Sequence, residues 1–97
     1  MSITRKAIYR MIDDERARQK IKWAGPHAWG IGDCSSSFVD DIVKSAVLSE
    51  ECGEVSRAVL DKDNDHLTKE LVQVAAVCVA WLECELKKGE ANGKRTD

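Results

Sequence analysis

Apolar residues recur every three or four positions along most of this chain, which is the spacing of one face of an α-helix. The pattern predicts a first helix over residues 3–24, whose inward stripe passes from apolar into polar positions. Gly25-Pro26 is expected to end this helix, because proline cannot donate the next helical hydrogen bond. The stripe comprises Ile8, Met11, Ile12, Glu15, Gln19 and Trp23.

A second helix is predicted over residues 37–61, because apolar residues again recur there at helical spacing. Ser37 and Asp40 have the spacing of a capping box, which places the start of this helix near Ser37. The preceding segment, residues 25–36, includes Gly30 and is expected to be an irregular loop. A loop of this length is long for a small domain, which indicates a functional or mobile segment.

A third helix is predicted over residues 66–88. Asp63 to Asp65 is expected to supply its N-cap, and Gly89 is expected to end it. Since only about four residues separate it from the second helix, the two must form an antiparallel hairpin. Residues 1–88 are therefore expected to form a single helical domain, followed by a polar tail over residues 89–97.

The third helix contains the longest apolar run of the chain, Leu71 to Leu82, in which Gln73 is the polar residue. The run is shorter than the roughly 20 residues that a bilayer span needs, so no membrane association is expected. It is apolar on nearly every side of a helix, and three helices cannot cover it completely. The predicted fold class is therefore an all-α antiparallel bundle that is completed by a second copy of the chain.

Composition narrows the class of protein further. The 97 residues are 43% hydrophobic and 33% charged, as expected of one globular domain. A net charge of −2 excludes a general nucleic-acid binder. Residues 1–24 nevertheless carry seven basic and three acidic side chains, whereas the remaining residues carry eight basic and fourteen acidic ones. The basic segment is either a solvated helix face or an element that faces an anionic ligand.

The four cysteines indicate the redox compartment. They show no C-x-x-C spacing, and no signal peptide is recognisable before them. We interpret them as reduced thiols of a cytoplasmic protein. The alternative is a zinc site formed by His27, Cys34 and two further cysteines, but this spacing matches no common zinc module.

Three carboxylates interrupt the apolar pattern of the second helix. Glu50, Glu51 and Glu54 lie between Val47 and Val55, and helical geometry places them within an arc of about 100°. One interpretation is that they are solvent-facing helix formers, because paired glutamates are common on helices. The other is that they form one side of an acidic site.

The third helix supplies the opposite side of such a site. Glu70 and Gln73 are three residues apart, and Glu54 and Glu70 lie at similar distances from the turn, so the two acidic groups should meet. Like charges in one partly buried place repel one another unless something neutralises them. Mg²⁺ prefers carboxylate oxygens and leaves coordination positions for phosphates, so it is the expected ion.

These residues resemble a known family. The pattern E-E-x-x-E on one helix and E-x-x-D on the next is typical of the MazG-like all-α nucleoside triphosphate pyrophosphohydrolases. Here the halves are Glu50-Glu51-Cys52-Gly53-Glu54 and Glu70-Leu71-Val72-Gln73. The surrounding VLSEECGEVSRAVL and LTKELVQVAAVCVAWLE are similar to short MazG-like proteins of bacteria and phages, and residues 15–23 are similar to their N-terminal helix.

The resemblance implies a bundle of the four-helix type, assembled as a homodimer or as a dimer-based tetramer. It implies hydrolysis of a (deoxy)nucleoside triphosphate to the monophosphate and pyrophosphate, as nucleotide-pool house-cleaning. It implies Mg²⁺, with Mn²⁺ as the alternative ion, held by Glu51, Glu54 and Glu70, with Glu50 as a further ligand or the catalytic base. Gln73 occupies the position of the family's fourth ligand, an aspartate, and a neutral amide binds Mg²⁺ more weakly and cannot act as a base.

The first helix offers residues for the substrate. Trp23 is expected either to stack on a base or to pack in the core, and Gln19 to contact the edge of the base. His27 and Trp29 form either a lid over the nucleotide or a fixed loop. The cations expected near the phosphates are Arg16, Lys20, Lys22 and Lys44.

Two other functions stay open on the sequence alone. A phosphoribosyl-ATP pyrophosphatase shares the acidic helix pair. A non-catalytic helical dimer that binds nucleotide or a protein partner would tolerate Gln73 in place of the family's aspartate.

Overall fold

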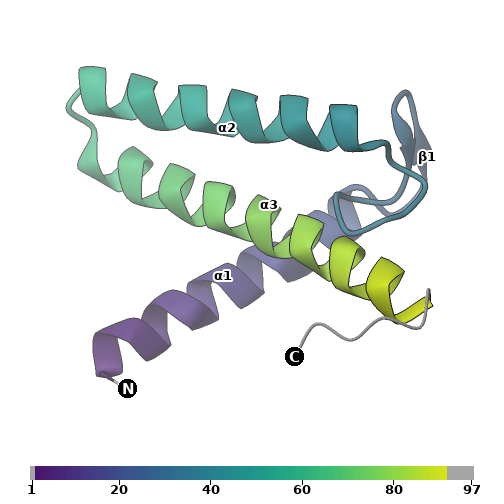
Figure 1. Cartoon of the computed structure of the whole chain (residues 1–97). Helices are drawn as coiled ribbons and strands as arrows, with labels where there is room; N and C mark the ends of the chain where they lie inside the picture. The colour runs from purple at the N-terminus through teal and green to yellow at the C-terminus, as the bar shows by residue number, and fades with distance from the viewer. Residues whose placement is uncertain (1, 92–97) are drawn as a thin grey trace.

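The computed structural model describes residues 2–91, and it is mostly helical (Figure 1). The elements follow in the order α1 (Ile3–Lys22), β1 (Pro26–His27), β2 (Gly30–Ile31), α2 (Asp41–Leu60) and α3 (Asn64–Ala91). The expected helical class is confirmed, with a small antiparallel hairpin added between α1 and α2. Within the described residues, no helix has both the length and the apolar character needed to cross a membrane.

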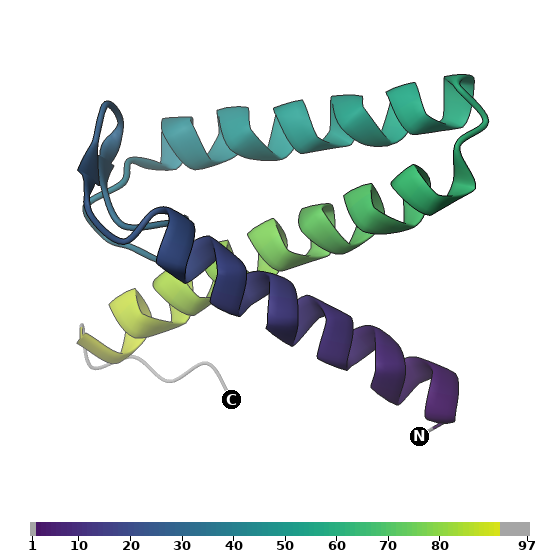
Figure 2. The same ribbon diagram turned by 180° about the vertical axis from the view of Figure 1, so that it is seen from behind.

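The helices α2 and α3 form the expected antiparallel hairpin and run side by side in both views (Figures 1 and 2). Lys62 adopts a positive φ of 54° in the turn between them. The Asp63 carboxylate accepts a hydrogen bond of 3.0 Å from the His66 N–H, which confirms an N-cap in this segment. Gly89 does not end α3, contrary to the prediction, because one glycine costs a helix only about 1 kcal/mol. The predicted tail therefore begins three residues too early, and residues 92–97 lie outside the described part.

The helix α1 crosses α3 at a steep angle, and its N-terminal half extends away from the hairpin (Figure 2). This crossing divides the predicted inward stripe into two parts. Ile8 and Met11 are 44% and 40% exposed, whereas Glu15, Gln19 and Trp23 are partly buried. The stripe therefore faces the rest of the chain only in the second half of α1.

Half of the segment expected to be an irregular loop forms a β-hairpin, in which Pro26 pairs with Ile31 and His27 with Gly30, while residues 32–36 are irregular as predicted. Gly30 also forms a bridge with Val39. A Cβ atom at Gly30 would overlap the Phe38 carbonyl oxygen, and its φ of 141° disfavours other residues.

The predicted capping box at Ser37 is therefore wrong. Ser37 and Phe38 lie in a turn in which the Val39 N–H donates to the Ser36 carbonyl at 3.3 Å, Val39 then bridges to Gly30, and α2 begins only at Asp41 with Asp40 as its N-cap residue. The Asp40 side chain makes no capping hydrogen bond.

The core is small and is centred on α3. The buried apolar residues are Val39, Ala58, Ala76, Val77, Ala80 and Cys84. The same helix leaves large apolar side chains exposed at Leu71, Val79, Leu82 and Leu86. These four residues follow steps of eight, three and four, so they share one face of the helix. As expected, three helices do not cover α3 on every side.

Candidate functional site

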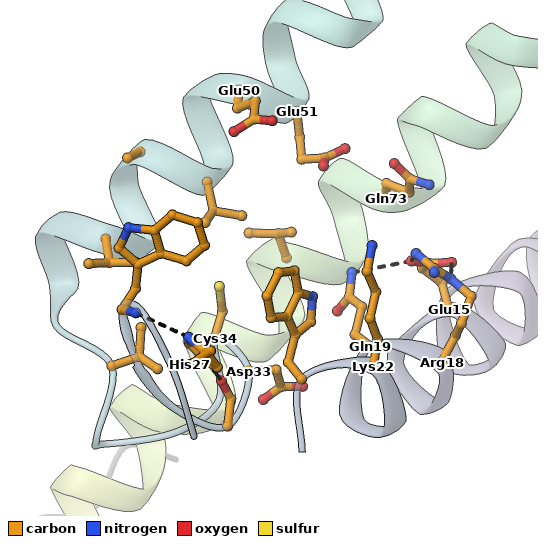
Figure 3. Close-up of a pocket in the computed structure, with 18 of the residues that line it drawn as sticks. Glu15, Arg18, Gln19, Lys22, His27, Asp33, Cys34, Glu50, Glu51 and Gln73 are labelled. Atoms are coloured by element: carbon orange, nitrogen blue, oxygen red, sulfur yellow. Dashed lines mark hydrogen bonds and ion pairs between the residues drawn. The ribbon is translucent and has the colours of Figure 1, made fainter. Parts of the chain in front are cut away.

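A cavity of about 660 Å³ lies between the second half of α1, the β-hairpin, and the facing sides of α2 and α3 (Figure 3). Figure 3 shows Glu50 and Glu51 on α2 at one end, with Gln19 and Lys22 extending from α1 on the other side. Six of the ten predicted site residues line this cavity. They are Gln19, Lys22, Trp23, Glu50, Glu51 and Gln73.

The inner part of the acidic site consists of Glu51, Glu70 and Gln73. The Gln73 amide nitrogen donates to Glu51 Oε2 at 2.8 Å and to Glu70 Oε2 at 3.1 Å. The amide is assigned in this orientation because the opposite one would place its oxygen against two acceptors. Gln73 thus holds the two carboxylates together as a neutral donor.

The two carboxylates repel one another despite this bridge. Burial, then the charge and contact of Glu70, and then Glu50 and Glu54 together raise the pKa of Glu51 to about 7. Glu70 itself is only 8% exposed. A carboxyl group with a pKa near neutrality, beside a second buried carboxylate, is typical of a site that a cation or a proton must neutralise.

The outer part of the acidic site adds a residue that the sequence analysis missed. Ligand atoms of Glu54, His66 and Glu70 all lie within 4.8 Å of one another, so Glu54 and Glu70 meet across the hairpin as predicted. His66 Nε2 lies 3.0 Å from Glu70 Oε1. The signal in the sequence was the spacing of four residues between His66 and Glu70, which places them on one helix face.

The wall formed by α1 carries charged and polar groups next to an aromatic cluster. Arg18 forms hydrogen bonds of 2.8 and 2.6 Å with the Glu15 carboxylate. Lys22 Nζ lies 5.3 Å from the centroid of the Trp23 ring. Arg18 was not among the predicted substrate residues, although it lines the cavity together with Lys22.

The aromatic cluster joins α1 to the β-hairpin. The Trp23 ring centroid lies 5.3 Å from that of His27 and 6.5 Å from that of Trp29, both in edge-on arrangements. His27 donates from Nε2 to the Gly32 carbonyl at 2.7 Å and accepts at Nδ1 from the Trp29 N–H at 3.2 Å. All three rings line the cavity, and these hydrogen bonds fix the position of His27 in the hairpin.

Three of the four predicted phosphate-binding cations do not line the cavity, and one of them, Lys20, is exposed on α1. Arg16 is buried and pairs with Asp33 at 2.6 Å and with Glu83 at 2.9 Å. Lys44 is fully buried, and its Nζ donates to Cys84 Sγ at 3.1 Å. Neither residue lines the cavity, so the cations on its wall are Arg18 and Lys22.

The arrangement can therefore bind an anion together with a metal cation. The carboxylates would hold the metal cation, and Lys22 and Arg18 would contact the anion. The side formed by α2 and α3 presents Glu50, Glu51 and Gln73, and the side formed by α1 and the β-hairpin presents Lys22, Arg18 and three aromatic rings, with Glu15 paired to Arg18. Comparisons with models of protein families, with curated proteins and with solved structures found no match to this chain. A function must consequently be argued from the residues of the cavity themselves.

Proposed function

We propose that this chain is a Mg²⁺-dependent, cytoplasmic pyrophosphohydrolase of the MazG-like type, which converts (deoxy)nucleoside triphosphates to monophosphate and pyrophosphate. The observation that carries the proposal is one cavity lined by Glu50 and Glu51 from α2 and by cations and aromatic rings from α1 and the β-hairpin. A nucleoside triphosphate has the matching parts, since its phosphates bind metal and cations and its base stacks on aromatic rings. The carboxylate pattern that resembles the family adds independent support.

The acidic residues fit a bound Mg²⁺ ion, with Mn²⁺ as the alternative. Glu51, Glu54 and Glu70 would hold it, because their mutual repulsion disappears when a divalent cation neutralises them. Such an ion polarises the phosphoryl oxygens and lowers the pKa of bound water. Gln73 keeps the carboxylates of Glu51 and Glu70 together as a hydrogen-bond donor.

The other residues of the cavity have roles that follow from their positions. Glu50 lines the cavity, and it is outside both the Gln73 bridge and the outer Glu54, His66 and Glu70 group, so it is free to take a proton from an attacking water. Lys22 and Arg18 would neutralise the phosphates. Trp23 would stack on the base and Gln19 would contact its edge.

The proposal includes a homodimer or a dimer-based tetramer. The exposed face of α3 with Leu71, Val79, Leu82 and Leu86 is larger than isolated apolar residues on a monomer surface would explain. A second copy of the chain would cover this face. Light scattering at micromolar concentration should therefore give at least twice the chain mass of 10.8 kDa.

A non-catalytic helical protein that binds nucleotide or a protein partner is the second candidate. Gln73 favours it, because the amide already satisfies both carboxylates and adds no charge for a metal ion. Under this alternative, nucleotide would bind in the cavity without being hydrolysed.

One assay separates the two candidates. The purified chain is incubated with each dNTP and Mg²⁺, and pyrophosphate release is measured for wild type, Glu51→Gln and Glu90→Gln. Glu90 is exposed near the end of α3 and serves as the matched control. We expect release by wild type and Glu90→Gln and none by Glu51→Gln. Binding of dNTPs without release by any of the three proteins would support the non-catalytic alternative.

A further inference from the structure

The outer part of the acidic site contains a nitrogen ligand that a purely acidic Mg²⁺ site does not need. His66 and Glu70 lie four residues apart on α3, and Glu54 faces them from α2. Their ligand atoms lie within 4.8 Å of one another. Donor atoms on one ion lie about 3–4 Å apart, given metal–ligand distances of about 2.0–2.2 Å, so small side-chain rotations would complete the set.

The two oxygens of Glu70 point to different neighbours. Oε2 accepts from Gln73 on the side of Glu51, whereas Oε1 lies 3.0 Å from His66 Nε2. One carboxylate therefore belongs to both parts of the acidic site. The inner part has oxygen ligands only, and the outer part has two carboxylates and an imidazole.

The charges around this outer part are not otherwise balanced. Within residues 2–90, no lysine or arginine forms an ion pair with Glu54 or Glu70. Glu70 is buried, and its donor on the other side, the Gln73 amide, is neutral, so no positive charge compensates the carboxylate there. His66 is half-exposed, so one side of its ring is accessible from solvent.

We propose that Glu54, His66 and Glu70 form a second metal site, for a divalent transition-metal ion, in the outer part of the acidic site. Imidazole nitrogen binds transition ions in preference to Mg²⁺, which favours oxygen ligands. The inference deepens the proposed function and rests on it in one respect, since Glu54 and Glu70 are shared with the proposed Mg²⁺ ligands. It adds a transition ion such as Mn²⁺ in the outer group, with Glu54 and Glu70 as ligands that this ion shares with Mg²⁺ and His66 as its own ligand.

The test uses the full chain, freed of metal by a chelator and then titrated with Mn²⁺ alone or Mg²⁺ alone. Mn²⁺ is the probe because the four free cysteines would compete for Zn²⁺. Pulsed electron paramagnetic resonance detects ¹⁴N bound directly to Mn²⁺, and calorimetry gives the Mg²⁺ affinity. His66→Gln removes the nitrogen, and His27→Gln is the matched control because His27 is the other histidine of the chain.

We expect a ¹⁴N signal from one imidazole in wild type and in His27→Gln, and none in His66→Gln. The Mn²⁺ affinity of His66→Gln should fall by at least about tenfold, because loss of a direct ligand should cost no less than loss of its hydrogen-bonding partner. Its Mg²⁺ affinity should stay within about twofold of wild type. The wild-type signal requires no variant, so it stands even if a substitution disturbs folding.

Two results would overturn the inference. If Mn²⁺ bound to the wild-type chain gives no ¹⁴N signal, His66 does not bind the ion and only pairs with Glu70 on the helix surface. Equal losses of Mn²⁺ and Mg²⁺ affinity in His66→Gln would mean that the histidine does not select the ion. A chain that binds Mn²⁺ through His66 and releases no pyrophosphate would keep this inference and lose the proposed function.

Discussion

Besides the buried Lys44, two groups of charged side chains are buried in this chain, and the two differ in how their charges are balanced. Beside the β-hairpin, Arg16 pairs with both Asp33 and Glu83. Along the α2–α3 hairpin, Glu51 and Glu70 lie together with only the Gln73 amide between them. We call the first group the balanced cluster and the second the acidic cluster.

The pKa values of the carboxyl groups in the two clusters depend on whether a positive charge lies beside them. Burial opposes the ionisation of Asp33, but hydrogen bonds from Ser35 and Arg16 outweigh it and hold the pKa of Asp33 below its ordinary value. At Glu51, burial and the neighbouring Glu70 act in the same direction and raise the pKa to about 7. The balanced cluster therefore links α1 to α3 and to the segment that follows the β-hairpin. In the described part of the chain, the acidic cluster has no lysine or arginine partner and could bind a cation.

The largest effect is expected from breaking the balanced cluster. Arg16→Met leaves Asp33 and Glu83 without their cation, and removal of one partner of a buried ion pair costs about 3–5 kcal/mol. Arg18→Met is the control on the same helix, since the exposed Arg18 pair with Glu15 should be worth about 1 kcal/mol or less. Denaturant unfolding measures both. Equal losses would show that the pairs of Arg16 contribute no more than a surface ion pair.

A substitution in the acidic cluster should have the opposite sign. Glu51→Gln removes a repelling charge, so the metal-free chain should gain about 1–2 kcal/mol of unfolding free energy at pH 8, after allowance for solvent screening. The stabilisation that wild type gains from millimolar Mg²⁺ should disappear in this variant. Glu90→Gln should change neither quantity. A less stable Glu51→Gln chain would place Glu51 among the groups that hold the fold together.

The pH dependence of stability should separate the clusters as well. Between pH 4.5 and 7, the folded chain keeps a proton on Glu51 that the unfolded chain has released, so the free energy of unfolding falls as the pH rises. We expect a fall of about 1 kcal/mol from pH 6 to pH 8 in metal-free protein, and a smaller fall with Mg²⁺. Asp33 acts in the other direction, since its stabilisation is lost only as the pH drops below its ordinary value of 3.8.

Melting temperatures measured from pH 3 to pH 9 test this expectation. Glu51→Gln should give a flatter profile between pH 6 and pH 8 than wild type. Equal slopes in the two proteins would assign the titration to another group.

The acidic cluster was predictable from sequence, and the balanced cluster was not, for a physical reason. Helical periodicity and a short turn fix the level at which Glu54 and Glu70 meet, because both constraints are local. The role of Arg16 depends on Glu83, which is 67 positions away, and on Asp33, which follows a β-hairpin that no local pattern predicted. The position of an arginine along a helix does not show whether its side chain is buried or exposed to solvent.

The hairpin escaped prediction for a related reason. Its strands are two residues long, and Gly30 is required there by the carbonyl of Phe38, a contact that only the folded chain contains. Lys44 shows the same limit, since its burial against Cys84 depends on how α2 and α3 pack. The acidic residues of the α2–α3 hairpin were therefore placed correctly, whereas Arg16 and Lys44, which depend on packing between distant elements, were not.

The smallest expected effect concerns Gln73, the uncharged residue between the two carboxylates of the acidic cluster. The amide donates to both carboxylates, so Gln73→Asp removes two hydrogen bonds and adds a third negative charge beside them. Gln73→Asn has the same length as aspartate without its charge and is the matched control. The metal-free Asp variant should be less stable than the Asn variant, because the added charge repels Glu51 and Glu70.

The affinity for Mg²⁺ should follow the opposite order to the stability of the metal-free variants. If Gln73 borders the metal, the Asp variant should bind Mg²⁺ a few-fold more tightly than the Asn variant, a difference of under about 1 kcal/mol. Calorimetry on both variants and on wild type measures it, and pyrophosphate release should be kept or raised in the Asp variant. Equal Mg²⁺ affinities, together with a less stable Asp variant, would make Gln73 a residue that serves folding alone. The carboxylates would then be balanced by the amide itself, and the non-catalytic alternative would be the better account of the acidic cluster.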